Sequence, residues 1–97
     1  MDKQIDMYKV KFRCAGWITN STRYFTASSA GEALKDIDYA MQHNMITCKT
    51  IIVKNVSRYN RFAAKWEPQD ILTINTKYST DKRGRILIHK HTEDGEI

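Results

Sequence analysis

The sequence predicts an α+β fold in which one helix packs on one face of a single antiparallel sheet. Two periodic patterns of apolar side chains in the first half of the chain support this prediction. Residues 7–14 alternate apolar and charged side chains, as a half-buried strand does. Residues 30–41 repeat apolar side chains every three or four positions, as one stripe of a helix does. Strand-like segments further on complete a β-β-α-β-β unit over residues 1–67 and a C-terminal β-hairpin over residues 68–91.

The first two strands are expected to form a hairpin. In residues 7–14 the side chains at positions 8, 10, 12 and 14 are apolar, and the other face carries Lys9, Lys11 and Arg13. Residues 19–22 are polar and favour a turn, and residues 23–27 (RYFTA) are rich in β-formers. The chain therefore begins with two antiparallel strands, of which the first has a cationic outer face.

The helix is predicted to begin near Ala30. Ser29 and Glu32 have the spacing of a capping box, in which both side chains satisfy backbone N–H groups of the first turn. Alanines within the apolar stripe permit a close approach to the sheet, and His43 and Asn44 mark the expected end. This helix should cover one face of the sheet.

The next segments read as two more strands. Residues 47–57 are apolar on both faces, which favours a central strand. Residues 58–61 (RYNR) are expected to turn, residues 62–66 to return as the fourth strand, and Pro68 to stop it. The register of residues 48–67 stays open, because a slip of one residue exchanges the core and surface sets.

The rest of the chain is predicted to be an added hairpin with strands at residues 71–78 and 85–90 and a turn at 79–84. Residues 92–97 are polar and acidic and are expected to fray. All 97 residues fit one small domain.

The composition favours a folded, soluble, basic protein. The net charge is +5, and residues 1–67 hold the whole excess, with eleven Lys and Arg against six Asp and Glu. No apolar run could cross a membrane, and the N-terminus lacks the apolar region of a signal peptide, so we expect a cytoplasmic protein. Cys14 and Cys48 are interpreted as two reduced core thiols, with a disulfide as the alternative.

Residues 48–67 mix cations with aromatic rings, a composition that suits the phosphates and bases of a nucleic acid. The candidate phosphate contacts are Lys9, Lys11, Arg13, Arg23, Lys54, Arg58, Arg61 and Lys65, and the candidate stacking residues are Tyr59 and Trp66. Two modes stay open. The uncovered sheet face could hold a single strand, or the turn at residues 58–61 could enter a duplex groove.

Catalysis and cofactors are not expected. No phosphate-binding loop, dinucleotide motif or nucleophile elbow is present. His89 and His91 would share a face of one strand, but two ligands do not complete a zinc site. The sequence therefore predicts a non-enzymatic protein without metal or cofactor.

The helix entry TASSAGEAL, the strands before it and the hairpin ending at residues 65–67 (KWE) resemble small accessory proteins of bacteriophages and mobile elements, including some anti-CRISPR proteins. The resemblance covers about residues 8–67 and transfers no functional residue. It implies action by binding in the host cytosol, on nucleic acid or on a host nucleoprotein complex.

Three alternatives accompany nucleic-acid binding. The chain could be an inhibitor or adaptor that docks on a host protein, because the turn with two arginines, Tyr59 and Phe62 has the composition of an interface hot spot. Edge strands of the added hairpin could pair in a symmetric homodimer. The aromatic residues could also be purely structural cross-strand pairs.

Overall fold

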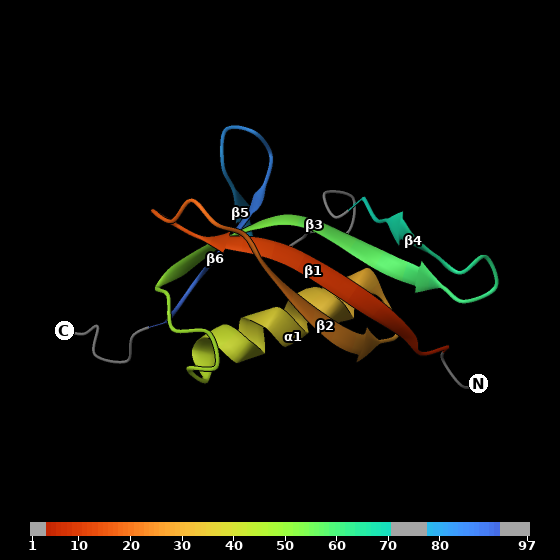
Figure 1. Ribbon diagram of the computed structural model, residues 1–97. Coiled ribbons are helices and arrows are strands. Elements are labelled where there is room, and N and C mark those ends of the chain that lie inside the picture. Colours follow the sequence, from red (N-terminus) through yellow and green to blue (C-terminus); the bar gives the residue numbers. More distant parts are fainter. Residues whose placement is uncertain (1–3, 71–77, 92–97) are drawn as a thin grey trace.

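The computed structural model describes residues 4–70 and 78–91 (Figure 1). One helix lies on one face of a single antiparallel sheet, which confirms the predicted α+β class. The elements in chain order are β1 (Asp6–Cys14), β2 (Ser21–Ala27), α1 (Ala30–Gln42), β3 (Thr50–Asn60), β4 (Lys65–Pro68), β5 (Ser79–Thr80) and β6 (Ile86–His89). No helix in the described part of the chain is long and apolar enough to span a membrane.

The strand order differs from the prediction of a four-stranded unit with a separate hairpin. The sheet runs β2-β1-β3-β6-β5, and β4 pairs with β3 beside that path. One edge of β3 is occupied by β1, and the other edge holds β6 against residues 50–53 and β4 against residues 57–60. At eleven residues, β3 is long enough to pair with both short strands. It is the central strand that its two-sided apolar pattern predicted.

The core lies between the sheet and α1, where β1 contributes Tyr8, Val10 and Phe12. The register is irregular between Lys11 and Phe12, because β3 carries Lys54 as an extra residue between the partners Val53 and Asn55. Such a bulge changes which way neighbouring side chains point. Here it leaves both Val53 and Val56 fully buried.

The helix forms as the sequence predicts. The Ser29 side chain accepts a hydrogen bond from the Glu32 backbone N–H, at 3.2 Å between Oγ and N. The buried residues of α1 are Ala30, Ala33, Leu34, Ile37, Ala40 and Met41. His43 caps the C-terminus and Asn44 follows at a φ of 62°, a left-handed conformation that asparagine tolerates.

The turn between β3 and β4 lies later than predicted. β3 continues to Asn60, whose side-chain oxygen accepts hydrogen bonds from the backbone N–H groups of Phe62 and Ala63. An asparagine that bonds its own following backbone favours a turn over a continued strand. Phe62 therefore lies in the turn, 89% exposed, and the expected fourth strand at residues 62–66 is wrong in its first three residues. The strand does end at Pro68.

The C-terminal hairpin is also displaced from the prediction. Residues 71–77 of its first predicted strand, and the acidic tail at 92–97, lie outside the described residues. The short β5 falls where the turn was expected, and β6 lies within the predicted second strand. Asp81 sets the turn, because its carboxylate accepts hydrogen bonds from the backbone N–H groups of Arg83 and Arg85, each at 2.9 Å.

Cys14 and Cys48 form a disulfide, so the interpretation as two reduced core thiols is wrong. Both residues are only partly buried, at the end of β1 and in the connection before β3. Their Cα atoms are 5.8 Å apart although 34 positions separate them in the sequence, a proximity that only the folded chain creates. The bond ties the end of β1 to the connection before β3, next to the backbone pairing of Cys14 with Ile51.

Candidate nucleic-acid interface

The sheet has one face under α1 and one face, here called the open face, that no described helix or strand covers. The register assigns side chains to the two faces, because directly paired residues point the same way. Lys9 pairs with Tyr24 and Ser57, and Lys11 pairs with Thr22 and Asn55. The outer face of β1 therefore lies on the open face, as the alternation in residues 7–14 predicted.

Three aromatic side chains, Tyr24, Tyr59 and Trp66, form an aromatic cluster on the open face. Trp66 pairs directly with Tyr59, and their ring centroids are 5.1 Å apart in an edge-on arrangement. Tyr24 approaches Trp66 from β2, at 5.9 Å between centroids. Lys9 Nζ lies 4.5 Å from the centroid of the Trp66 ring, a cation–π contact. Four strands thus bring rings and an ammonium group to one place.

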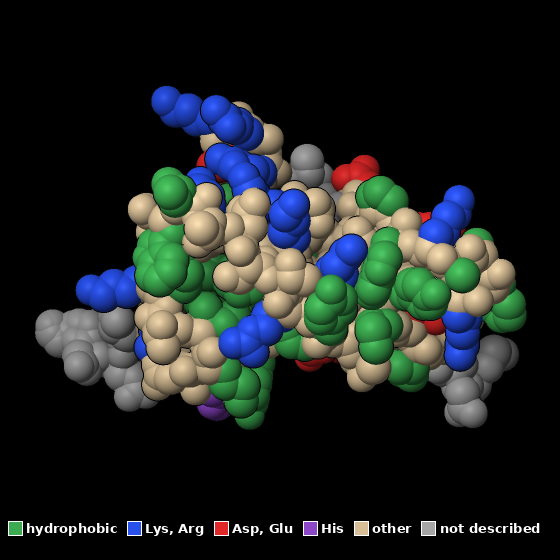
Figure 2. Space-filling view, viewed as in Figure 1, with side chains coloured by type: hydrophobic (Ala, Val, Ile, Leu, Met, Phe, Trp, Pro, Cys, Tyr) green, Lys and Arg blue, Asp and Glu red, His purple; other side chains and the backbone are tan. Residues whose placement is uncertain are grey.

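A cationic groove of about 620 Å³ lies at the other end of the open face. It runs between the β1–β2 connection and the β5–β6 hairpin. Its lining residues are Arg13, Ile18, Asn20, Lys54, Asp81, Lys82, Arg83 and Arg85. In Figure 2, Lys and Arg side chains run from this hairpin at the upper left toward the middle of the molecule, and hydrophobic side chains gather to their right.

The charges of the groove are poorly balanced. Arg85 is paired with Asp81, with Nη2 2.8 Å and Nε 2.9 Å from Oδ2. Within residues 4–70 and 78–91, no ion pair involves Arg13, Lys54 or Arg83. Partial burial lowers the pKa of Lys54, and the charges of Arg85, Arg13, Arg83 and Lys11 lower it further. An anion in the groove would relieve this repulsion.

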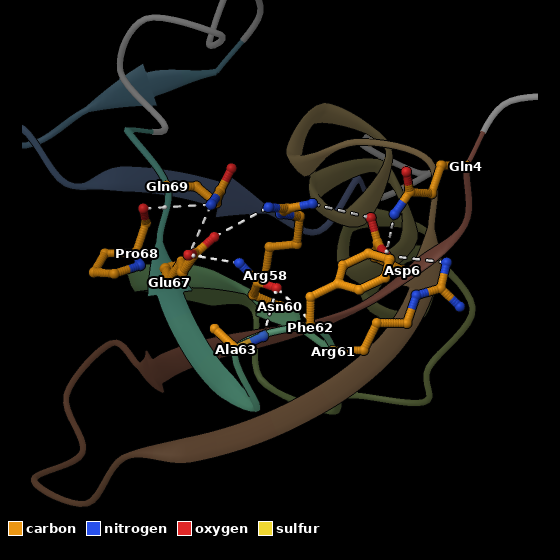
Figure 3. Close-up of polar contacts among 10 residues, drawn as sticks. All are labelled: Gln4, Asp6, Arg58, Asn60, Arg61, Phe62, Ala63, Glu67, Pro68 and Gln69. Atoms are coloured by element: carbon orange, nitrogen blue, oxygen red, sulfur yellow. Dashed lines mark hydrogen bonds and ion pairs between the residues drawn. The ribbon is translucent and has the colours of Figure 1, made fainter.

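Arg58 lies on the face under α1, at the far end of β3 from the groove. Its Nη1 donates to Asp6 Oδ2 at 3.3 Å and its Nη2 to Glu67 Oε1 at 3.0 Å (Figure 3). Asn60 Nδ2 donates to Glu67 Oε2, also at 3.0 Å. We call Asp6, Arg58, Asn60 and Glu67 the Arg58 corner. Hydrogen bonds from Asn60 and Arg58 lower the pKa of Glu67, and those to Glu67 and Asp6 raise the pKa of Arg58.

The ten candidate residues therefore do not share one surface. Six lie on the open face, in the aromatic cluster or beside the cations: Lys9, Lys11, Arg13, Lys54, Tyr59 and Trp66. The expectation that Arg23 and Arg58 join them is wrong. Arg23 pairs with buried Val10 and donates to the Met45 carbonyl oxygen at 2.9 Å, and Arg58 pairs with buried Tyr8.

The remaining two candidates lie near the Arg58 corner. Arg61 is in the β3–β4 turn, with Nη2 4.0 Å from Asp6 Oδ1. Lys65 is exposed and pairs with Asn60, one position along from Tyr59 and Trp66, so the register places it on the Arg58 side. These two cations are separated by the sheet from the cationic groove.

Sequence reasoning missed Tyr24, Lys82 and Arg83. Tyr24 stands in a predicted strand, outside residues 48–67, where cations and aromatic rings are mixed. Lys82 and Arg83 belong to the basic run KRGR at residues 82–85, in a region whose overall charge is balanced. The local run was the available signal.

The histidines form no metal site in the described part of the chain, where no group of three or more His, Cys, Asp or Glu side chains is placed to hold an ion. His89 is exposed, with Nδ1 3.0 Å from Thr50 Oγ1. The absence of catalysis stays a prediction.

Comparison with protein-family models, with curated proteins and with solved structures found no match to this chain. The resemblance to phage accessory proteins over residues 8–67 and the cytoplasmic location therefore stay predictions. Function must be inferred from the geometry of the open face.

Proposed function

We propose that this chain is a small, non-catalytic nucleic-acid-binding protein that uses the open face of its sheet. One observation carries the proposal: the aromatic cluster and the cationic groove occupy the same uncovered face, joined by the outer side chains of β1. Aromatic rings can stack on bases, and cations beside them can neutralise the backbone.

The unbalanced positive charge of the cationic groove supports a polyanionic ligand. Arg13, Lys54 and Arg83 surround the groove without an acidic partner in the described chain, and partial burial together with the neighbouring cations disfavours the charged form of Lys54. Like charges held together in a folded protein cost stability, and a bound phosphate removes that cost. The Arg58–Arg61 turn has less support as a duplex-reading ribbon, because Asp6 and Glu67 already occupy the Arg58 guanidinium.

A fluorescence anisotropy titration with labelled oligonucleotides at several salt concentrations tests the proposal. We expect binding at low salt that weakens as salt rises, because phosphate contacts release counterions. Lys54→Gln should reduce the salt slope by about 1, as expected for one lost phosphate contact. The matched control is Lys35→Gln, since Lys35 is exposed on α1, away from the open face, and also carries one charge.

The wild-type protein failing to bind any oligonucleotide at low salt would refute the proposal. Equal salt slopes for Lys54→Gln and Lys35→Gln would mean that the protein binds nucleic acid but that the cationic groove does not contact its phosphates.

A second candidate is an inhibitor or adaptor, of the phage or anti-CRISPR type, that docks on a host protein or nucleoprotein complex. The exposed Phe62 at the β3–β4 turn favours it, with the Arg61 guanidinium 5.9 Å from the ring centroid. Such a pair has the character of an interface anchor. Pull-down from host lysate with and without nuclease separates the candidates: partners that survive nuclease treatment, and are lost in Phe62→Ala, support docking on protein.

Self-association is a third arrangement that edge pairing would allow. β5 of the added hairpin is the outer strand at one side of the described sheet, and β2 is the outer strand at the other. Light scattering at working concentration tests it, and a monomer mass counts against it.

A further inference from the structure

The aromatic cluster and the cationic groove are separated by a distance that suits a short nucleic-acid segment. Lys9 is beside the rings and Arg13 lines the groove, four residues apart on β1. At roughly 3.3 Å per residue this separation is about 13 Å. Nucleotides stacked as in a duplex rise about 3.4 Å each along one strand, so at most about four nucleotides cover the same length.

The rings of the cluster differ in what they can offer to a base. Trp66 is half-buried, with Lys9 against its ring, and Tyr59 is half-buried against Trp66. Tyr24 is 58% exposed and has Trp66 behind it at 5.9 Å between centroids. An exposed ring that is held by a second ring can stack on a base without first being freed from other contacts.

Whether the bases of a nucleic acid are paired determines whether one of them can stack on Tyr24. In a duplex the base faces are covered by neighbouring pairs, and the outer surface offers phosphates and groove edges. A single strand can turn an unstacked base onto an aromatic ring while its phosphates lie in a basic groove. An open face with cations alone would suit both forms, whereas the exposed ring adds contact only for the unpaired one.

We propose that the open face binds a single-stranded segment of up to about four nucleotides, with a base stacked on Tyr24 and phosphates in the cationic groove. This inference rests on the proposed nucleic-acid function and specifies its ligand. It assigns the main stacking role to Tyr24, with Trp66 supporting its ring and Lys9 supplying a charge beside it.

The experiment measures dissociation constants for oligo-dT and oligo-U of two to eight nucleotides, and for a DNA duplex, by anisotropy. The single strands should bind more tightly than the duplex, and affinity should rise with length up to about four nucleotides and then level off. Tyr24→Ala should weaken single-strand binding by about tenfold or more, as loss of one base–ring stack does. Tyr24→Phe should bind like the wild type, because the ring remains.

Tyr39→Ala is the matched control. Tyr39 is 56% exposed, almost the same as Tyr24, but it lies on α1 and stacks on His43. It should bind like the wild type. Thermal unfolding of each variant shows that a loss of affinity is not a loss of fold.

The outcomes separate this inference from the proposed function. Equal affinity for duplex and single strand, or an unchanged affinity in folded Tyr24→Ala, overturns the single-strand assignment while nucleic-acid binding stands. No binding of any oligonucleotide overturns both.

Discussion

The Arg58 corner and the cationic groove lie at opposite ends of β1 and β3, and they place cations in opposite surroundings. At the corner, one guanidinium meets two carboxylates, and one of these, Asp6, has a side chain only 8% exposed. In the groove, Arg13, Lys54 and Arg83 face one another, and the only acid among the lining residues, Asp81, is bound to Arg85. Arg13 Nη1 donates to the Trp17 carbonyl oxygen, but none of these three cations has an acidic partner among the described residues. The same residue types therefore neutralise carboxylates at one end and keep an unneutralised charge at the other.

Counting cations along a sequence overstates a binding site, because the fold neutralises some of them. Arg58 was a leading candidate because it stands among basic and aromatic residues. One of its two acidic partners, Asp6, is 52 positions away, so no local pattern reveals that ion pair. The cations available to a ligand are those without an acidic partner in the fold.

The largest expected effect comes from the disulfide, which ties the chain together at the groove end. Replacing Cys14 and Cys48 by Ser should lower the free energy of unfolding by about 4 kcal/mol, from the entropy of the loop that the bond closes. Urea denaturation measures it, and a reductant should shift the wild type in the same way. A reductant with no effect on the midpoint would show that the bond does not contribute.

The next largest effect is at the Arg58 corner. Arg58→Met should lower the unfolding midpoint, because Asp6 keeps a nearly buried carboxylate without its closest cation and Glu67 loses its 3.0 Å partner. Nucleic-acid affinity should change less than about twofold, since Arg58 is on the other face of the sheet. A large loss of affinity in a folded Arg58→Met protein would contradict the division between the two regions.

Lys54→Met should show the reverse pattern: it should reduce oligonucleotide affinity without lowering stability. Removing a charge that sits among four other cations should raise the unfolding midpoint slightly, while oligonucleotide affinity falls. Paired denaturation and anisotropy measurements on Lys54→Met and Arg58→Met test the comparison directly. A lower midpoint for Lys54→Met would mean that its stem packing outweighs the repulsion.

The smallest effects are in the pH dependence, where the two regions should respond at opposite ends of the scale. The pKa of Glu67 is lowered in the folded protein, so its stabilisation is complete above its unfolded pKa of about 4.3 and is lost as the pH falls through the folded value. The pKa of Lys54 is also lowered, so its folded form gives up the proton first. The contribution of Lys54 to stability should then rise with pH up to its unfolded pKa of about 10.4, while the raised pKa of Tyr78, about 12, acts in the opposite direction above pH 10.

Urea midpoints measured across these two ranges check the signs. The acid loss should be smaller in Arg58→Met, and the alkaline gain should be absent in Lys54→Met. A wild-type midpoint that falls steadily above pH 8 while that of Lys54→Met falls equally would refute the assignment to Lys54.

Much of the fold was predictable where the signal is local. The alternation in β1 correctly predicted which side chains face the core, and Ser29 with Glu32 correctly predicted the start of α1. The predictions are wrong where pairing with a segment far away in the sequence determines the structure. β6 pairs with β3 across more than thirty residues, and the bulge at Lys54 depends on the register with β1. For the candidate site, six of the ten residues share the open face, and Tyr24 and Arg83 joined them only in the structure.

The sequence by itself determined the helix, the first strand with its cationic outer face and the basic character of the chain, because these follow from the period and composition of neighbouring residues. Only the tertiary structure decided that Cys14 meets Cys48, that Asp6 neutralises Arg58, and that Tyr24, Lys54 and Arg83 lie on one face. The physical reason is that pairing between strands sets the distances between side chains far apart in sequence, and those distances fix which charges and rings remain available to a ligand.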